Sequence, residues 1–307
     1  MRHVFIINPA AGHTDQTKWY RQEIQRCCQG LDYEIHVSHA PGVCRALAKE
    51  TAQKGDPVRI YACGGDGTLN EVAAGAAGYP NAAITNFTGG SGNDFVRMFG
   101  EPGAFRDLQR LLDCREAEFD LIDCNGDLGL NICSVGLDAR IGTEVGFYKR
   151  IPLFGGHAAY LLSTLINVIR GVSQHYVVEI NGERIDGELT MICVASGRYY
   201  GGGFNPVPEA DPTDGQLDVL VITKVSRLKI AQVVGEYKKG NYRKFPHLIR
   251  HFRTDKVRIL CDDVSPINLD GELRRGKTVE MSIAREKVRF FFPKELDFAS
   301  KTPVLTK

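Results

Sequence analysis

Two glycine-rich segments of this 307-residue chain each carry an aspartate, and each directly follows an apolar run. Gly64–Asn70 reads GGDGTLN and contains Asp66, whereas Gly89–Phe95 reads GGSGNDF and contains Asp94. Glycines let the backbone approach a phosphate group, and the N-terminus of a following helix offers unpaired N–H groups. An aspartate can bind a divalent metal ion or its water ligands. The segments predict phosphate and metal chemistry, although Asp66 could instead cap the helix of a tight turn.

Apolar runs alternate with helix-compatible stretches through the first third of the chain, which predicts a doubly wound parallel sheet. The expected strands are Val4–Ile7, Tyr33–Val37, Val58–Cys63 and Ala82–Asn86. Ligands bind at the carboxyl edge of such a sheet, where both glycine segments and a third loop, Asn8–Gly12, are expected to meet. Three loops at one edge favour a nucleotide site, with Mg²⁺ bridging the phosphates.

After about residue 120 the pattern changes to strand-like runs with few helices and with Asn-Gly and Asp-Gly turn signals. This pattern predicts a mainly antiparallel β-sandwich domain with one helix near residues 155–171, and an active site between the two domains. We therefore divide the α/β chain into a nucleotide-binding domain (1–122), a β-rich substrate domain (123–293) and a tail (294–307). The expected strands of the second domain are Leu130–Val135, Tyr176–Ile180, Leu189–Ala195, Leu217–Thr223, Lys256–Leu260, Val279–Ile283 and Lys287–Phe292.

Composition excludes several classes of protein. The formal net charge of +1 argues against a globally basic nucleic-acid binder, so no nucleic-acid partner is expected. The nine cysteines include no CxxC pair, which argues against a zinc site or a disulfide framework. Polar residues and glycines interrupt Leu153–Ile169, the most apolar stretch, so it is a poor membrane span. The N-terminus lacks a signal-peptide pattern, and we expect a soluble cytoplasmic protein.

The motifs in their order resemble those of the diacylglycerol kinase catalytic-domain family, in its small bacterial soluble lipid-kinase branch. The resemblance runs from Asn8 to Glu272 and is most specific in GGDGTLNEV, GSGNDF and the late Asp270-Gly271-Glu272. Supporting matches are Asn131–Ala139, Tyr199–Gly203 with Pro208 and Ala210, and Asp214-Gly215 with Leu217-Asp218.

The resemblance implies transfer of the ATP γ-phosphate to a lipid hydroxyl, with diacylglycerol as the leading acceptor. It implies that Asp66, Asp94 and Asp120 organise a catalytic Mg²⁺ and its water. Asp270 would be the general base, beside Glu272. The implied nucleotide-binding residues are Asn8, Pro9, Ala10, Ala11, Gly12, Gly65, Asp66, Gly67, Thr68, Leu69, Asn70, Glu71 and Ser91.

The resemblance also implies a second, structural Mg²⁺ on the β domain, held by Asp214 with the backbone of Asp211 and Gln216. Independently of the family, phosphoryl transfer needs a carboxylate to accept the hydroxyl proton, and Asp270 could reach across a cleft to do so. Asp270-Gly271 alone would be read as an ordinary hairpin turn. Gly271–Thr278 matches the P-loop pattern, but an alternating strand pattern follows it instead of a helix, so we interpret it as a chance match.

Basic residues are concentrated between Lys224 and Arg258, where eleven lysines and arginines face only Glu236 and Asp255. The segment could be a solvated face, or it could attract an anionic membrane that presents the lipid substrate. Leu153–Ile169 could add an apolar surface there or close the β-domain core. We expect peripheral contact with the inner face of the membrane, and the sequence leaves a homodimer open.

Four other functions are compared with this pattern. An NAD kinase also uses a GGDG turn, but it is not expected to combine that turn with GSGNDF and a late Asp-Gly-Glu. A sphingoid-type or other lipid-alcohol kinase shares all three motifs, and the sequence barely distinguishes it from a diacylglycerol kinase. A non-catalytic regulator is disfavoured by the intact Asp66, Asp94 and Asp270, and a dehydrogenase by the lack of GxGxxG after the first strand.

Overall fold

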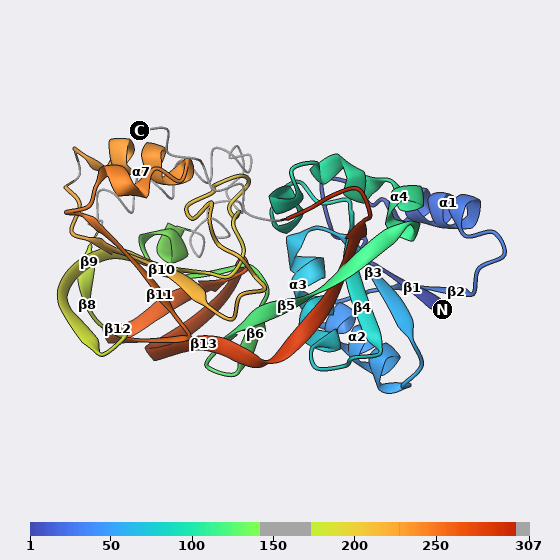
Figure 1. Cartoon of the computed structure of the whole chain (residues 1–307), viewed down its shortest axis with the longest axis horizontal. Coiled ribbons are helices and arrows are strands. Elements are labelled where there is room, and N and C mark those ends of the chain that lie inside the picture. The colour runs from blue at the N-terminus through green and yellow to red at the C-terminus, as the bar shows by residue number, and fades with distance from the viewer. Residues whose placement is uncertain (142–172, 227, 299–307) are drawn as a thin grey trace.

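The computed structural model describes residues 1–141, 173–226 and 228–298, which form two lobes joined by long strands (Figure 1). Four parallel strands form the first lobe, in the order β2-β1-β3-β4. The strands β1, β3 and β4 are almost entirely buried, as continuous apolar runs require of a sheet covered on both faces, whereas the edge strand β2 is half-buried. The predicted parallel sheet is confirmed. The bounds are β1 Arg2–Ile7, β2 Tyr33–Val37, β3 Val58–Gly64 and β4 Ala82–Thr88.

Short connections place helices against this sheet. Helix α3 starts directly at Asp66, so the first glycine segment forms the turn between β3 and α3. Helices α2 and α3 pack so closely that a Cβ on Gly75 would lie 2.3 Å from the Arg45 carbonyl oxygen. The helical segments of the first lobe are α1 Thr17–Cys27, α2 Val43–Gln53, α3 Asp66–Ala76, η1 Phe95–Phe99, η2 Pro102–Arg106 and α4 Leu108–Leu112.

The second lobe is built from antiparallel strand pairs, as the alternating patterns predicted. Their inward side chains form one apolar core that includes Val178, Ile192, Val219 and Ile259. A second apolar cluster lies between the sheet and α7 (Ile230–Lys238). The other elements are β7 Ile132–Gly136, β8 Gln174–Ile180, β9 Glu183–Ala195, β10 Leu217–Thr223, η3 Tyr242–Lys244, β11 Ile249–Thr254 and β12 Lys256–Leu269.

Two long strands, β5 (Cys114–Cys124) and β13 (Glu272–Pro293), run from one lobe to the other (Figure 1). The first part of β13 pairs with β12, and Arg289 and Phe290 pair in parallel with β4. A short strand, β6 (Asp127–Gly129), pairs with β5. The last residues of β13, which the sequence division places in the second domain, thus complete the sheet and core of the first lobe. The division itself stays a prediction.

Three further expectations concern single segments. Gly271–Thr278 lies at the start of β13 with no helix after it, which confirms that the P-loop match is accidental. Within the described ranges, no helix is long and apolar enough to cross a membrane. The helix expected at 155–171 and the apolar stretch Leu153–Ile169 lie outside the described residues.

Candidate active site

A single cavity of about 880 Å³ is lined by both lobes and has two chemically different ends. Its loop end consists of residues from Asn8–Gly12, from Gly65–Glu71 and from Gly90–Asp94, together with Asp270 and Glu272. Its other end, called the apolar arm below, extends between the second-lobe sheet and α7. The arm is lined by Leu137, Ile141, Met191, Phe204, Ile222, Ile230, Val233, Val234 and Tyr237.

The three loops pack backbone against backbone. A Cβ added to Gly90 would lie 2.4 Å from the Cα of Gly65, and one added to Gly12 would lie 2.6 Å from the Gly89 carbonyl oxygen. Side chains at Gly12 and Gly90 would therefore push the loops apart. A Cβ on Gly67, in contrast, would meet no atom within 4 Å, and Gly67 lines the cavity. This open space at the N-terminus of α3 fits an anionic group such as a phosphate.

Asp66 and Asp94 lie together, as predicted from the sheet topology. The Asp66 Oδ1 accepts hydrogen bonds from the backbone N–H groups of Asp94 (2.6 Å) and Phe95 (3.2 Å). Burial, followed by the nearby Asp94 carboxylate, raises the pKa of Asp66. Asp94 is itself buried and pairs with Arg97 at 3.1 Å. Two adjoining carboxylates, one half-buried and one buried, are the type of donor set that a divalent cation stabilises.

Asp94 also connects the two lobes. Its Oδ2 accepts a hydrogen bond of 2.7 Å from the backbone N–H of Gly202, which lies 108 residues further along the chain. Gly202 has a φ of +79°, a backbone conformation that favours glycine. The second glycine segment is thus held to the second lobe directly at the cavity.

The structure places the predicted nucleotide-binding residues at the loop end, except that Pro9 and Ala10 do not line the cavity. The Asn8 side chain orders the first loop, because its Nδ2 donates to Thr68 Oγ1 (3.0 Å) and its Oδ1 accepts from Ala10 N–H (3.0 Å). The buried Asn70 Oδ1 has no hydrogen-bond partner among the described residues. This unsatisfied acceptor lines the cavity and fits a polar ligand.

Glu71 has a further contact outside the cavity. Its carboxylate accepts hydrogen bonds from the N–H groups of Gly42 (3.0 Å) and Arg45 (3.3 Å), at the start of α2. A carboxylate at a helix N-terminus satisfies unpaired N–H groups and interacts favourably with the helix dipole. Glu71 therefore has a structural role beside its predicted position along the nucleotide.

Asp270 lies in the turn between β12 and β13 and faces the cavity. Its carboxylate accepts hydrogen bonds from the backbone N–H groups of Leu130 (2.5 Å), Asn131 (3.1 Å) and Ile132 (2.8 Å). Burial raises the pKa of Asp270 to about 6, against the lowering effect of these hydrogen bonds. The charge of Asp66, which lies in the other lobe, also raises this pKa.

Glu272 lines the same cavity and pairs with Arg274 at 2.9 Å. Asp120 does not join this group among the described residues. It lies on β5, where its Oδ2 accepts from the Gly215 N–H (2.8 Å) and its Oδ1 pairs with Lys287 (3.0 Å). The predicted grouping of Asp120 with Asp66 and Asp94 thus has no direct contact to support it. The sequence patterns predicted no strand over β5, so they could not reveal which loop Asp120 contacts.

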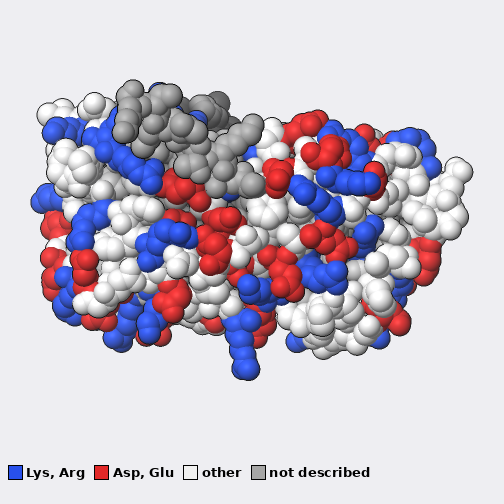
Figure 2. Space-filling model, viewed as in Figure 1, with Lys and Arg blue, Asp and Glu red and all other residues white. Residues whose placement is uncertain are grey.

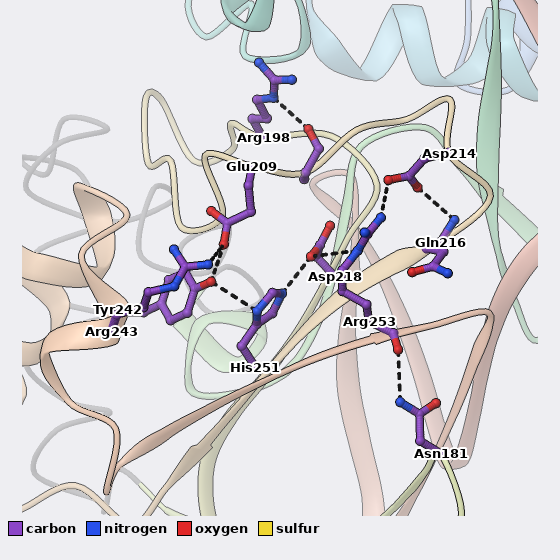
Figure 3. Close-up of polar contacts among 11 residues, drawn as sticks. Asn181, Arg198, Glu209, Asp214, Gln216, Asp218, Tyr242, Arg243, His251 and Arg253 are labelled. Atoms are coloured by element: carbon purple, nitrogen blue, oxygen red, sulfur yellow. Dashed lines mark hydrogen bonds and ion pairs between the residues drawn. The ribbon is translucent and has the colours of Figure 1, made fainter. Parts of the chain in front are cut away.

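The predicted structural magnesium loop is shown in Figure 3. Asp214 forms an ion pair with Arg253, and its Oδ1 accepts the Gln216 N–H at 3.0 Å. The Asp211 carboxylate binds the N–H and hydroxyl of Thr213. The positive charge beside the Asp214 carboxylate is thus the Arg253 guanidinium. A metal ion bound by Asp214 would require the Arg253 side chain to move. This ligand set stays a prediction, and the described residues contain no cluster of three metal-ligating side chains.

Arg253 belongs to a longer chain of contacts on β10 and β11 (Figure 3). His251 Nε2 lies 2.6 Å from Oδ1 of the buried Asp218, and His251 Nδ1 lies 3.1 Å from the Tyr242 hydroxyl. Tyr242 in turn donates to Glu209, which also pairs with Arg243. These contacts fix the loop before β10 on the second-lobe sheet and keep the Asp214 turn in place.

Sequence reasoning missed several features of the cavity. The three N–H groups that hold Asp270 come from Leu130–Ile132, and the N–H that holds Asp94 comes from Gly202. Asp138 lines the cavity where the loop end meets the apolar arm, and it accepts a hydrogen bond of 2.6 Å from Ser134 Oγ. Burial raises the pKa of Asp138. Apart from Leu130, these residues fall within Asn131–Ala139 and Tyr199–Gly203, two segments that resemble the family, and this resemblance was the signal that could have found them.

Two family models match the chain and together cover both lobes. Residues 2–124 match the diacylglycerol kinase catalytic domain. Residues 131–292, more than half of the chain, match the YegS C-terminal NAD kinase beta sandwich-like domain. The chain belongs to the family defined by the YegS C-terminal domain, and it carries a diacylglycerol kinase catalytic domain in front of that domain. The resemblance noted from the motifs is thereby confirmed, as is the two-domain α/β architecture, and members of this family are kinases.

Two relatives are similar to this chain along most of its length. A protein named "Putative lipid kinase" from Staphylococcus carnosus (strain TM300) is 24% identical over 297 residues, covering 95% of this chain and 96% of its own. A protein of the same designation from Staphylococcus aureus (strain JH9) is 23% identical over 239 residues, covering 77% and 78%.

Solved structures share the fold of this family. One is a crystal structure described as "a putative diacylglycerol kinase from Bacillus anthracis str. Sterne", with a TM-score of 0.73 and 22% sequence identity. It covers 95% of this chain, and 96% of its own chain is matched. A second structure from the same organism has a TM-score of 0.69 and 20% identity, over 94% and 96% of the two chains. At these identities the likeness concerns the fold.

Proposed function

We propose that the protein transfers the γ-phosphate of ATP to the hydroxyl group of a lipid, with diacylglycerol as the leading acceptor. One observation carries the proposal: a single cavity joins glycine loops and carboxylates at one end to an apolar arm at the other. A nucleotide matches the loop end, and acyl chains match the arm. Asp270 lines the loop end of this cavity.

The residues at the loop end would hold ATP and Mg²⁺, which supply the phosphoryl group and neutralise its charge. Open space beside Gly67, the unsatisfied Asn70 Oδ1 and the adjoining Asp66 and Asp94 fit this role. Because the three glycine loops are packed together without side chains between them, they are ordered before the ligand binds. Preorganised N–H donors stabilise developing charge without rearranging.

Asp270 would accept the proton of the acceptor hydroxyl as the phosphoryl group is transferred. With a pKa of about 6, it is mostly ionised at neutral pH yet remains more basic than an ordinary aspartate. The three N–H groups of Leu130–Ile132 hold its carboxylate in a fixed orientation. Glu272, paired with Arg274, would add a second fixed negative charge at this side of the cavity.

The test is an acceptor panel. Purified protein is incubated with labelled ATP, Mg²⁺ and diacylglycerol in anionic mixed micelles, with sphingosine, ceramide and NAD in parallel. Label in phosphatidic acid is the expected result. Transfer to sphingosine or ceramide alone would keep the mechanism and change the acceptor, because a sphingoid-type base also has an apolar chain for the arm.

A second candidate is NAD kinase activity, because the second lobe matches a domain described as NAD kinase beta sandwich-like. The apolar arm argues against it, since NAD offers no long apolar chain to fill a space lined by Leu137, Met191 and Ile222. Label transferred to NAD and to none of the lipids would refute the lipid-kinase proposal.

A further inference from the structure

The basic segment Lys224–Arg258 is largely neutralised by the fold. Of its ten described basic residues, seven form ion pairs with carboxylates, most of them from distant parts of the sequence. The pairs are Lys224–Glu188, Lys239–Glu236, Arg243–Glu209, Lys244–Glu236, Arg250–Glu183, Arg253–Asp214 and Arg258–Glu179. Most of the positive charges in this segment are therefore paired with carboxylates. The net charge of the segment overstates its attraction for an anionic membrane.

The surface around α7 differs from the rest of this segment. Lys229 and Lys238 are exposed and form no ion pair with a described residue, although Lys238 lies 5.0 Å from the centre of the Phe204 ring. Figure 2 shows Lys and Arg side chains gathered at the upper left of the molecule, over the region where Figure 1 places α7. Positive charge thus remains available at this end of the second lobe.

Large exposed apolar side chains accompany that charge. Leu228 is 95% exposed and Val234 is 38% exposed, and Ala231 between them is exposed as well. The N–H groups of Lys229 and Ile230 both bond to the Ser226 carbonyl oxygen at 3.0 Å, so a helical turn already begins at Leu228. Residues three apart on a helix share a face. Leu228, Ala231 and Val234 therefore form one apolar stripe, called the α7 edge.

The α7 edge is continuous with the cavity. Ala231 and Val234 are exposed and also line the cavity, so the apolar arm reaches the surface of the protein along this helix. On the inner face of α7, Ile230, Val233 and Tyr237 are buried against the sheet and line the arm. An apolar path thus leads from a fully exposed leucine to the interior of the arm.

Given the lipid acceptor proposed above, on which this inference rests, we infer that the α7 edge docks on an anionic lipid bilayer and aligns the cavity mouth with it. Leu228 and Val234 would enter the interfacial region, and Lys229 and Lys238 would contact anionic headgroups. A lipid could then pass along α7 into the arm without exposing its chains to water. Docking is transient, because the edge offers few apolar side chains.

Vesicle co-sedimentation of the full chain tests this surface without requiring turnover. The wild type is mixed with phosphatidylcholine vesicles and with vesicles containing about 30% phosphatidylglycerol. We expect stronger binding to the anionic vesicles, weakened by salt. Leu228→Glu, which replaces an exposed apolar group by a negative charge, should lower that binding at least fivefold, and Lys229→Glu should lower it severalfold.

The matched control is Leu31→Glu, because Leu31 is also exposed (41%) but precedes β2, at the sheet edge opposite the glycine loops. Its vesicle binding should equal that of the wild type, and thermal unfolding should show all variants folded. Equal binding of Leu228→Glu and wild type, or no preference of the wild type for anionic vesicles, overturns the inference. A dimer that Leu228→Glu converts to a monomer would also overturn it and assign the edge to a second copy of the chain.

The two proposals fail separately. Binding that depends on Leu228, in a protein that phosphorylates no lipid, would support the docking surface and refute the proposed function. Phosphorylation of lipids by a protein whose vesicle binding is indifferent to Leu228→Glu would do the reverse.

Discussion

Asp270→Asn separates the proposed general base from a purely structural turn residue. Asp270 has a φ of +50°, a conformation that asparagine tolerates well, so the substitution preserves the backbone. The amide keeps one oxygen to accept hydrogen bonds from Leu130–Ile132 but cannot accept a proton. Loss of a general base lowers turnover by about 10²- to 10⁴-fold.

The effect on stability can be worked out from the pKa. Folding raises the pKa of Asp270 from 3.8 to about 6, which corresponds to about 3 kcal/mol between its two protonation states. Because the folded pKa is raised, this group's contribution to stability is complete below pH 4 and is lost as pH rises through about 6. Asparagine does not titrate and avoids this cost of about 3 kcal/mol at pH 8, whereas its NH2 group leaves a backbone N–H without an acceptor, at a cost of about 1–3 kcal/mol.

We therefore expect a thermal midpoint within a few degrees of the wild type and a nearly unchanged affinity for ATP, with turnover almost abolished. Steady-state kinetics, calorimetric ATP binding and thermal unfolding measure the three quantities. Asp123→Asn is the matched control, since Asp123 Oδ1 also holds a β-turn through the Gly126 N–H (2.7 Å). It should keep full turnover. An Asp270→Asn rate above about a tenth of wild type would show that Asp270 is not the base.

Four further outcomes are expected. The kcat/KM for the acceptor should rise about tenfold per pH unit up to pH 6 and then level off, and a flat profile from pH 5 to 7.5 would contradict Asp270 as the base. Asp66→Asn should raise the Kd for ATP at least about tenfold by weakening the bonds to the second glycine loop, as calorimetry would show. Asp138→Asn should raise the KM for the lipid and leave that for ATP unchanged; the opposite pattern would move Asp138 to the nucleotide site. Asp214→Ala should lower the thermal midpoint and abolish any stabilisation by Mg²⁺, whereas a wild-type midpoint indifferent to Mg²⁺ would remove the structural metal.

The sequence by itself determined the local elements and the loop end of the site. Strand-like patterns predicted β2 and β10 at their exact bounds, and in β10 burial on both faces of the sheet leaves a continuous apolar run in the chain. The glycine segments were recognisable because backbone packing between loops permits no side chain at positions such as Gly12 and Gly90. Asp66 and Asp94 could be assigned to one site since topology brings strand ends to a common edge, whereas Asp270 was assigned to that site from the family resemblance.

Only the tertiary structure decided which distant groups meet. Periodicity describes one strand and not its partners, so it could not show that β13 completes the first lobe or that Asp120 contacts Gly215 and Lys287. The net charge of the segment Lys224–Arg258 predicted a basic face. The fold instead pairs most of these basic residues with carboxylates that lie far away in the sequence. The cavity likewise depends on contacts between residues more than a hundred positions apart, such as Asp94 with Gly202, which no local pattern encodes.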